Sequence, residues 1–381
     1  MVQKKINLCF VYPESNTWTG EDNYFKSLLS SLSLLKSKKL NVHIFCSIEK
    51  KKYLLKFIKK KFEVSAFFEK NSTFMILRKI IKLIFKKDLV LEYFFKKNKI
   101  NIISHYLPVH GIKSICWIPD LQHFFLKNFF SNIELKRRDS LFNNYIRNAD
   151  KVIVSSKDTY FNLKKYYKIN NTRTAILNFV PTINFSELKN FNYLKNKYNL
   201  HPNYIYVPNQ FWMHKNHNIL IQSAILLKKK NDKCKFVITG NPSSGSGNSV
   251  YLDFVRSITV NKVDKYFDLL GFVSYADVLN LIFHSKILLN PSLFEGWSTT
   301  VEEGKIFNKK MLLSDLSVHK EQCSNKATYF KRNNPNELAK KIIQLSKVRN
   351  TYPKISIIKK NYKKSRILFA KSYLKIIESL V

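Results

Sequence analysis

The sequence has little of what several classes of protein require. Its 381 residues include only 8 glycines and 10 prolines, too few for a fibrous or low-complexity chain. No apolar run reaches the roughly 18 residues of a membrane-spanning helix, because lysines interrupt every candidate. The start, MVQKKINLCFVYPES, passes from a short basic segment directly into an expected strand. We therefore expect no signal peptide and a cytoplasmic location.

Cysteine frameworks and metal-ligand clusters are also lacking. The five cysteines are odd in number, far apart and mostly set in apolar runs, which is typical of buried free thiols in a cytosolic protein: Cys9, Cys46, Cys116, Cys234 and Cys323. No Asp-x-Asp motif occurs. His214 and His217 stand three positions apart, but no carboxylate or thiolate lies nearby to complete a metal site. We expect neither a metal ion nor a cofactor.

Acidic residues are scarce, because 26 Asp and Glu stand against 66 Lys and Arg, a formal net charge of +40. This charge has three interpretations: nucleic-acid binding, attraction to an anionic membrane, or a coding bias toward lysine. Lysine supplies 57 of the basic residues and arginine only 9. Nucleic-acid readers favour arginine for bidentate base contacts, so we expect no nucleic-acid partner. Residues 50–99 are enriched beyond the general bias, with 16 basic and 4 acidic residues.

Two series of strand-length apolar runs alternate with amphipathic stretches such as YFKSLLSSLSLLKS, residues 24–37. Such alternation predicts parallel sheets covered by helices. The first series comprises residues 6–12, 42–48, 100–104, 114–118, 151–156 and 175–180. The second comprises residues 204–208, 235–240, 266–272, 286–292 and 309–315.

A polar, asparagine-rich segment separates the two series, PTINFSELKNFNYLKNKYNLHP, and we interpret it as a domain junction. The sequence therefore predicts an α/β protein with two Rossmann-like domains that face each other across a cleft. The expected parts are an N-terminal domain (1–180), a linker (181–202), a C-terminal domain (203–357) and a helix (358–381) that packs back toward the N-terminal domain.

The stretch PSLFEGWSTTVEEGKIFNKKMLLSD, residues 291–315, carries the strongest chemical signal. It follows an expected strand with a loop and a helix, and ligands of open α/β sheets bind beyond the carboxyl ends of the strands. Gly296 lets the backbone approach a ligand closely. A helix that starts at Ser298, Thr299 or Thr300 offers unpaired N–H groups and partial positive charge to a phosphate.

Two glutamates eight positions apart bracket this helix start. Glu303 lies about one turn inside the helix, where a carboxylate can accept both hydroxyls of a ribose. Glu295 lies on the loop and would face whatever is attached beyond the phosphates. The spacing fits a nucleotide-sugar. The alternative is that Glu303 only favours its own helix start and that Glu295 is solvated.

The same residues carry a family resemblance. EGWSTTVEE, residues 295–303, resembles the Glu-x7-Glu motif of retaining GT-B glycosyltransferases of the group 1 (family 4) type. The resemblance is most specific over 269–315 and extends to 204–227. WIPDLQHFFLKNFF (117–130) and DKVIVSSKDT (150–159) are similar to a polysaccharide-building branch of that family. The resemblance implies a GT-B fold with an acceptor-binding N-terminal domain and a donor-binding C-terminal domain.

Roles for single residues follow from the resemblance. Lys215 would bind the donor phosphates, Glu303 the ribose, and Glu295 would lie at the donor sugar. Phe272 and Val273 would line the nucleobase pocket. The donor-binding residues that the resemblance implies are Asn209, Lys215, Phe272, Val273, Gly296, Ser298, Thr299, Thr300 and Glu303.

Two departures from the family pattern concern residues expected at the site. Many relatives carry an arginine six residues before the lysine, where this chain has Asn209. Either the clamp on the diphosphate is one charge weaker, or His214 and Asn216 contribute donors. Near the first strand a double glycine is usual, but only Gly20 stands in TWTGEDNY. We expect Gly20 and Trp18 on the acceptor side.

The first domain offers two candidates for catalysis. Asp120 and His123, in IPDLQHFF, follow an expected strand, so we expect both to face the cleft. A carboxylate or imidazole there could orient the acceptor hydroxyl or stabilise positive charge on the donor sugar. Glu295, Asp120 and His123 are thus the expected catalytic residues. The alternative is an aspartate that caps its helix and a histidine that packs in the core.

The segment FMILRKIIKLIFKK, residues 74–87, is predicted to form an amphipathic helix. Arg78, Lys79, Lys82 and Lys86 fall within about 100° of arc, and Ile, Leu and Phe occupy most of the opposite side. Such a helix can lie on an anionic membrane with its apolar side down, which would suit a lipid-linked acceptor. The alternative is a surface helix whose apolar side packs on the core.

These observations predict a metal-independent, retaining glycosyltransferase of the hexosyltransferase type. It would move a sugar from a nucleoside-diphosphate sugar to a hydroxyl of a glycan or lipid-linked glycan in cell-surface polysaccharide synthesis. We expect it in the cytoplasm, or peripheral on the inner face of the membrane. A nucleotide-sugar epimerase of the same fold and a basic nucleic-acid-binding protein are the alternatives; the latter predicts steeply salt-dependent binding and no need for Glu303.

Overall fold

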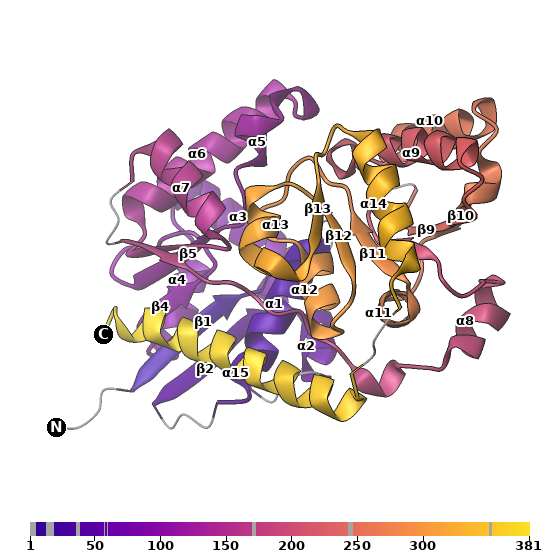
Figure 1. The fold of residues 1–381 in the computed structure, drawn as a ribbon. Helices are drawn as coiled ribbons and strands as arrows, with labels where there is room; N and C mark the ends of the chain where they lie inside the picture. The colour runs from indigo at the N-terminus through magenta and orange to yellow at the C-terminus, as the bar shows by residue number, and fades with distance from the viewer. Residues whose placement is uncertain are drawn as a thin grey trace.

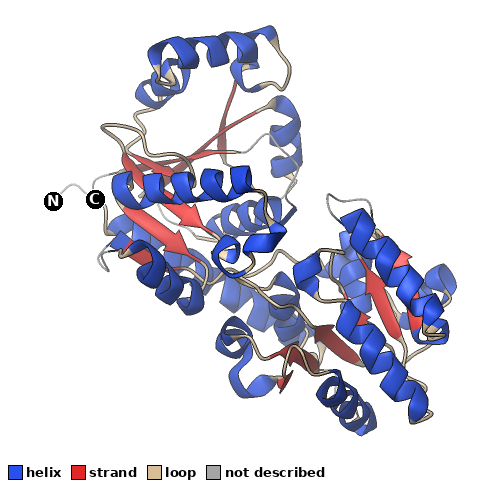
Figure 2. Ribbon diagram, turned by 90° about the horizontal axis from the view of Figure 1, so that it is seen from above, coloured by secondary structure: helices blue, strands red, loops and turns tan. Residues whose placement is uncertain are grey.

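A computed structural model describes residues 5–12, 19–35, 39–56, 58, 60–169, 173–242, 247–349 and 353–381. Two parallel β-sheets, one from each half of the chain, form the centres of two α/β domains (Figure 1). Seen from above, the strands fall into two separate groups with helices around each (Figure 2). The predicted fold class, α/β with two Rossmann-like domains, is confirmed.

The N-terminal domain contains a seven-stranded sheet in which each strand runs parallel to its neighbours, in the order β3-β2-β1-β4-β5-β6-β7. Its strands are β1 (Ile6–Val11), β2 (Leu40–Cys46), β3 (Lys61–Val64), β4 (Ile102–Ser104), β5 (Lys113–Ile118), β6 (Lys151–Val154) and β7 (Thr174–Ile176). Its helices are α1 (Thr19–Leu32), α2 (Ile48–Leu55), α3 (Thr73–Phe85), α4 (Leu89–Lys97), α5 (Gln122–Phe125), α6 (Asn132–Asn148) and α7 (Lys157–Tyr167).

The C-terminal domain contains a six-stranded parallel sheet in the order β10-β9-β8-β11-β12-β13. Its strands are β8 (Ile205–Val207), β9 (Phe236–Thr239), β10 (Phe267–Gly271), β11 (Ile287–Asn290), β12 (Met311–Ser314) and β13 (Thr328–Phe330). The helices of this half are α8 (Phe191–Tyr198), α9 (Asn218–Lys229), α10 (Gly247–Val260), α11 (Tyr275–His284), α12 (Thr299–Ile306), α13 (Ser317–Cys323), α14 (Pro335–Lys347) and α15 (Ile355–Glu378).

The strands form where the apolar runs predict them, because a parallel sheet covered on both faces needs uninterrupted apolar residues. Every residue of β8, β9, β11 and β12 is buried. Two strands were not predicted, β3 and β13, and both lie at the edge of a sheet. Their sequences, KFEV and TYF, are short and only partly buried, so their apolar signal is weak.

Serine side chains start several helices. Ser131 accepts a hydrogen bond from the backbone of Glu134 at 3.2 Å, Ser156 from Thr159 at 3.0 Å, and Ser274 from Asp277 at 3.1 Å. Each hydroxyl satisfies an N–H group that the first turn of a helix leaves without a partner. Local sequence therefore sets where these helices begin, before any packing is considered.

The segment expected as a linker, residues 181–202, packs in part on the C-terminal domain. Asp277 of α11 is buried and accepts hydrogen bonds from three side chains of α8: Tyr193 at 2.9 Å, Lys197 at 2.8 Å and Tyr198 at 3.0 Å. Because a buried carboxylate needs such partners, α8 is bound to this domain.

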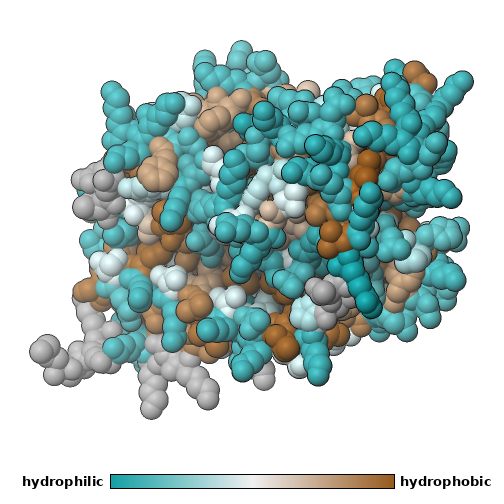
Figure 3. All heavy atoms as spheres, viewed as in Figure 1, coloured by the Kyte–Doolittle hydropathy of each residue, from teal (hydrophilic) through white to brown (hydrophobic). Residues whose placement is uncertain are grey.

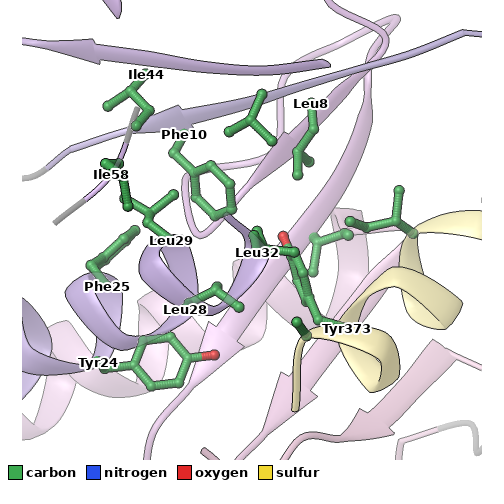
Figure 4. Close-up of a cluster of buried hydrophobic side chains, with 14 of the residues drawn as sticks. Leu8, Phe10, Tyr24, Phe25, Leu28, Leu29, Leu32, Ile44, Ile58 and Tyr373 are labelled. Carbon is green, nitrogen blue, oxygen red and sulfur yellow. The ribbon is translucent and has the colours of Figure 1, made fainter. Parts of the chain in front are cut away.

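The long C-terminal helix α15 joins the two domains (Figure 1). Its first half buries Ile358 and Tyr362 in the core of the C-terminal half. Its second half enters the core of the N-terminal domain, where Tyr373 lies near Phe10 with ring centroids 6.2 Å apart (Figure 4). The hydroxyl of Tyr373 donates a hydrogen bond to Ser104 Oγ at 2.5 Å. The chain therefore returns to the domain from which it started.

The five cysteines form no disulfide; four are buried and Cys234 is partly buried. Among the described residues, no helix combines the length and apolar character that crossing a membrane requires. Hydrophilic side chains spread over the whole face seen in Figure 3, with smaller hydrophobic groups between them.

Candidate active site

The loop between β11 and α12 forms the centre of the candidate site. Ser298 is the N-cap of α12, and its Oγ accepts hydrogen bonds from the Val301 N–H at 3.4 Å and from Asn290 Nδ2 at 2.9 Å. Gln322 of α13 clamps the same residue, because its amide bonds both the N–H and the C=O of Ser298, at 3.1 and 3.0 Å. The helix start at Ser298, Thr299 and Thr300 is therefore held rigidly from two sides.

Glu295 and Lys215 form an ion pair across the carboxyl ends of the strands. Lys215 Nζ lies 2.7 Å from Glu295 Oε1, and the two side chains are only 17% and 10% exposed. Ser292 donates a further hydrogen bond to the same oxygen at 2.7 Å. Burial would raise the pKa of Glu295, but the positive charge of Lys215 outweighs it and holds the pKa at about 2. Glu295 is thus an anion at neutral pH and is not solvated freely.

Glu303 has a different environment. Its carboxylate is 3% exposed and accepts one hydrogen bond from the hydroxyl of Tyr275 at 2.7 Å. Burial raises the pKa of Glu303 to about 7, although the Tyr275 hydrogen bond opposes the shift. The two glutamates of the motif therefore differ in charge near neutral pH, because only Glu295 has a cationic partner.

A cavity of about 470 Å³ lies between the two domains, and Tyr275, the partner of Glu303, lines it. One wall comes from the ends of β8, β9 and β10 and from α11: Pro208, Gln210, Thr239, Gly240, Phe272, Val273, Tyr275 and Val278. The other wall comes from α1 and α2: Asp22, Asn23, Lys26, Glu49, Lys50 and Tyr53. Phe272 and Val273, predicted to line a nucleobase pocket, do line this cavity. Glu303 lies behind the wall and is joined to it by Tyr275.

A polar cluster that we did not predict forms the N-terminal wall of the cavity. Asp22 accepts hydrogen bonds from the hydroxyls of Tyr12, at 2.6 Å, and Tyr53, at 2.9 Å, and Lys50 Nζ lies 3.7 Å away. These residues are far apart in sequence, so no motif spacing could indicate them. Gly20 lies in the first turn of the same α1. Trp18, predicted beside it on the acceptor side, lies outside the described residues.

Gly296 makes a close contact with the N-terminal domain. A Cβ atom at this position would lie 2.7 Å from Asp120 Cβ and closer still to the Pro119 carbonyl oxygen. This contact by itself requires glycine, and the predicted close approach to a ligand stays a prediction. Its neighbours also touch that domain: Phe294 packs near Phe125, and Trp297 donates to the Phe179 carbonyl oxygen at 3.2 Å.

Asp120 and His123 do not form a pair facing the cleft. Asp120 accepts a hydrogen bond from the Gln122 N–H, at 3.0 Å, in the turn before the short helix α5, and it lies 3.5 Å from Arg138, beside Gly296. His123 is 3% exposed and packs against Phe124 and Phe142. Burial lowers the pKa of His123. The prediction that the imidazole faces the cleft is wrong, because α5 turns it into the apolar interior of the domain.

Of three predicted donors near Lys215, two bond to the protein itself and the third is uncharged. Asn209 is 3% exposed and bonds Asn290 Oδ1 at 3.2 Å, so it lies beneath the site, whereas its neighbour Gln210 lines the cavity. Asn216 donates to two backbone carbonyl oxygens, those of Pro291 and Arg332. Burial lowers the pKa of His214 to about 3, so it carries no positive charge at neutral pH.

Further positioning residues came from outside the motif. Tyr275, Ser292, Asn290 and Gln322 contact Glu303, Glu295 or Ser298 directly. Ser292 and Asn290 lie at the end of the predicted strand 286–292. The sequence therefore could have predicted that they lie at the edge of the sheet where ligands bind. Tyr275 and Gln322 reach the site only through the packing of α11 and α13. Within the described part of the chain, no group of three or more His, Cys, Asp and Glu is arranged to hold a metal ion.

Comparisons with known proteins agree with this arrangement. Residues 191–364 match the family described as Glycosyl transferases group 1. No curated protein matches this chain in sequence. Among solved structures, a glycosyltransferase from Rickettsia africae ESF-5 is 17% identical with a TM-score of 0.63, over 99% of this chain and 97% of that chain.

Two further structures have the same architecture. HepE of Anabaena, solved in complex with UDP and glucose, is 13% identical with a TM-score of 0.64, over 98% of this chain and 99% of that chain. Sucrose-phosphate synthase from Thermosynechococcus elongatus is 11% identical with a TM-score of 0.67, over 99% of each chain. At these identities the likeness shows the fold, which is GT-B. The resemblance noted from residues 295–303 agrees with the family match over residues 191–364, and the GT-B fold is confirmed.

Proposed function

We propose that this chain, which has the GT-B fold and matches the group 1 glycosyl transferases over residues 191–364, moves a hexose from a nucleoside-diphosphate sugar to a hydroxyl of a glycan or lipid-linked glycan. In this proposal the anomeric configuration is retained, no metal ion takes part, and the product belongs to a cell-surface polysaccharide. HepE of Anabaena was solved with UDP, which makes UDP the first nucleotide to test.

The observation that carries the proposal is the Lys215–Glu295 ion pair beside the start of α12. Asn290 bonds both Glu295 and Ser298, so a cation and a helix N-terminus lie close together there, and such a pair suits a diphosphate. In the structure, the Glu295 carboxylate is paired with the ammonium group of Lys215. A donor diphosphate would share that ammonium group and leave Glu295 directed at the attached sugar.

The reaction needs charge stabilisation at the leaving group. As the bond between the anomeric carbon and the diphosphate oxygen breaks, negative charge grows on the nucleoside diphosphate. Lys215 and the N–H groups at Thr299 and Thr300 would stabilise that charge, because they are fixed before the reaction begins. Glu295, an anion at neutral pH, would stabilise positive charge on the donor sugar. The acceptor would enter from the N-terminal domain, near Asp120 and the cluster around Asp22.

The first experiment measures thermal stabilisation by UDP, GDP, ADP, CDP and dTDP in the presence of EDTA, for wild type and for Glu303→Ala. A ligand at 100 times its Kd adds about 2.7 kcal/mol to the free energy of unfolding. We expect one nucleotide to raise the Tm of wild type and to lose most of that effect in the variant. If a nucleotide raises the Tm without EDTA but not with it, only the proposed metal independence is contradicted.

Two outcomes would support the other candidate functions. If short oligonucleotides stabilise the protein and no nucleotide diphosphate does, the charge of +40 serves nucleic-acid binding and the proposal fails. If a nucleoside diphosphate binds, and the sugar of the matching nucleotide-sugar is isomerised without any acceptor, the protein is an epimerase. Incubation with a single nucleotide-sugar, followed by mass and NMR analysis of the sugar, separates these outcomes.

A further inference from the structure

Helix α3 packs on the protein through the part of its polar side that contains Arg78. Its two buried side chains are Met75 and Arg78. The Arg78 guanidinium lies 2.8 Å from Asp88 at the start of α4, and it stacks over the ring of Phe68 at 4.9 Å. Ser72 caps the first turn through the Met75 N–H at 3.0 Å. The ion pair therefore anchors the helix by the side that a surface helix normally exposes to water.

The apolar side of α3 faces solvent as a result. Leu83 is 81% exposed and Ile84 67%, although both lie in a helix with an apolar stripe. The alternative in which this stripe packs on the core is therefore wrong. Two apolar side chains of α4 lie exposed nearby in sequence, and we call the whole set the α3 patch: Phe74, Ile76, Leu77, Ile80, Leu83, Ile84, Phe85, Leu89 and Tyr93.

Basic residues border the α3 patch. Lys79, Lys82, Lys86 and Lys87 are exposed on or beside α3, and Lys96 and Lys97 are exposed at the end of α4. On a helical wheel, Lys79 lies at the edge of the apolar arc of α3, with Lys86 and Lys82 beyond it. Leucine, isoleucine and phenylalanine on one side with lysine at its edge is the arrangement of a helix that lies in a lipid–water interface.

We propose that the α3 patch docks this protein on an anionic lipid bilayer. The apolar side chains enter the boundary between headgroups and acyl chains, and the lysines contact the headgroup phosphates. The Arg78–Asp88 pair holds the helix in the orientation that this requires. The proposal goes beyond the transfer reaction and does not depend on it, since binding to lipid is measured without any substrate.

Charge favours a lipid surface over a second copy of the chain as the occupant. Two copies that met through the α3 patch would bring twelve lysines of its border together, in molecules that each carry a formal charge of +40. An anionic bilayer covers the same apolar surface and neutralises that border. The complementarity therefore selects lipid.

The test measures sedimentation of the full chain with phosphatidylcholine vesicles and with vesicles that contain phosphatidylglycerol in addition. We expect binding to the anionic vesicles only. Lys79→Gln/Lys82→Gln/Lys86→Gln should weaken the partition roughly 100-fold, and Leu83→Ser/Ile84→Ser at least about tenfold.

Matched controls remove the same charge or the same apolar surface elsewhere. Lys229→Gln/Lys230→Gln/Lys233→Gln changes three exposed lysines of the C-terminal domain. Leu252→Ser/Val260→Ser changes two exposed apolar residues of α10. Both controls should bind vesicles as wild type does, and all variants should keep the wild-type circular dichroism spectrum.

Three results would overturn the proposal. The first is absence of vesicle binding by wild type. The second is an equal effect of the control lysines, because binding would then reflect overall charge alone. The third is a dimer in light scattering that Leu83→Ser/Ile84→Ser converts to a monomer, since a second copy would then cover the α3 patch.

Discussion

The two sides of the cleft are built differently. On the C-terminal side, Glu295, Ser298 and Gln322 form a network in which each polar side chain has several partners. On the N-terminal side, the cavity wall consists of longer side chains gathered around Asp22. One of the two residues predicted for catalysis on this side, His123, is buried in the core.

This difference shows where the molecule is preorganised. A site that stabilises charge must be fixed before the reaction, because reorganisation would cost the energy that catalysis needs. The C-terminal side has that property. The N-terminal domain touches the C-terminal side through the contacts of Phe294, Gly296 and Trp297. The N-terminal domain therefore contributes by its position. The predictions below separate these two contributions.

Lys215→Met should have the largest effect. It leaves the Glu295 carboxylate in a mostly buried site without its cation, so the free energy of unfolding should fall by about 3 kcal/mol and transfer by at least about 100-fold. Urea unfolding and initial rates measure the two effects. Lys235→Met, which removes the more exposed partner of Asp268, should cost less than about 1 kcal/mol and leave transfer unchanged. Equal effects of the two changes would contradict the special role of Lys215.

Gly296→Ala should break the contact between the domains. Its Cβ would collide with Pro119 and Asp120, and overpacking of this kind costs about 1–3 kcal/mol. Transfer should fall about tenfold, while the Kd of the nucleotide changes little because its residues lie on one domain. Kinetics measures the loss of transfer, and calorimetry measures the Kd of the nucleotide. In Gly304→Ala the atoms nearest to the new Cβ belong to the side chains of Met311 and Leu288, within the C-terminal domain. This control should therefore show no loss of transfer that is larger than its change in Kd.

Glu303→Gln tests the raised pKa of that carboxyl. With a pKa of about 7, Glu303 is about nine-tenths ionised at pH 8 and about one-tenth at pH 6. If ribose needs the carboxylate, the wild-type Kd for the nucleotide should rise about tenfold from pH 8 to pH 6, whereas the variant should bind weakly at both.

The same group predicts a dependence of stability on pH. Burial raises the folded-state pKa above the ordinary value of 4.5, so the folded state binds this proton more tightly than the unfolded state does. The contribution of Glu303 to stability is therefore lost as pH rises from 4.5 toward 7. The free energy of unfolding of Glu303→Gln should fall less over this range than that of wild type. Parallel pH profiles would contradict the assignment.

His123→Phe should have the smallest effect. The imidazole is buried among Phe124 and Phe142, and its Nδ1 has no hydrogen-bond partner among the described residues. The free energy of unfolding should therefore change by less than about 1.5 kcal/mol, and transfer should match that of wild type. A loss of transfer above tenfold, without loss of stability, would place His123 in the reaction after all.

Local sequence was sufficient for features that depend on neighbours in the chain. Apolar runs predicted the strands β11 and β12, and Ser298 was among the expected helix starts. Two of the four edge strands, β3 and β13, escaped prediction, because KFEV and TYF are too short and too poor in aliphatic residues to produce an apolar signal. The amphipathic pattern of α3 was visible, but its orientation was not, since that depends on the pairing of Arg78 with Asp88.

By itself, the sequence predicted the fold, through the periodicity of its apolar runs, and the edge of the sheet near which Lys215, Glu295 and Glu303 lie. The family resemblance rests on the residues of the 295–303 motif, and both kinds of signal act over a few residues. Only the tertiary structure decided that Gly296 touches the other domain, that Asp22 faces the cavity, that His123 is buried and that α3 turns its apolar side outward. Each of those depends on contacts between segments distant in sequence, and such contacts leave no periodicity to read.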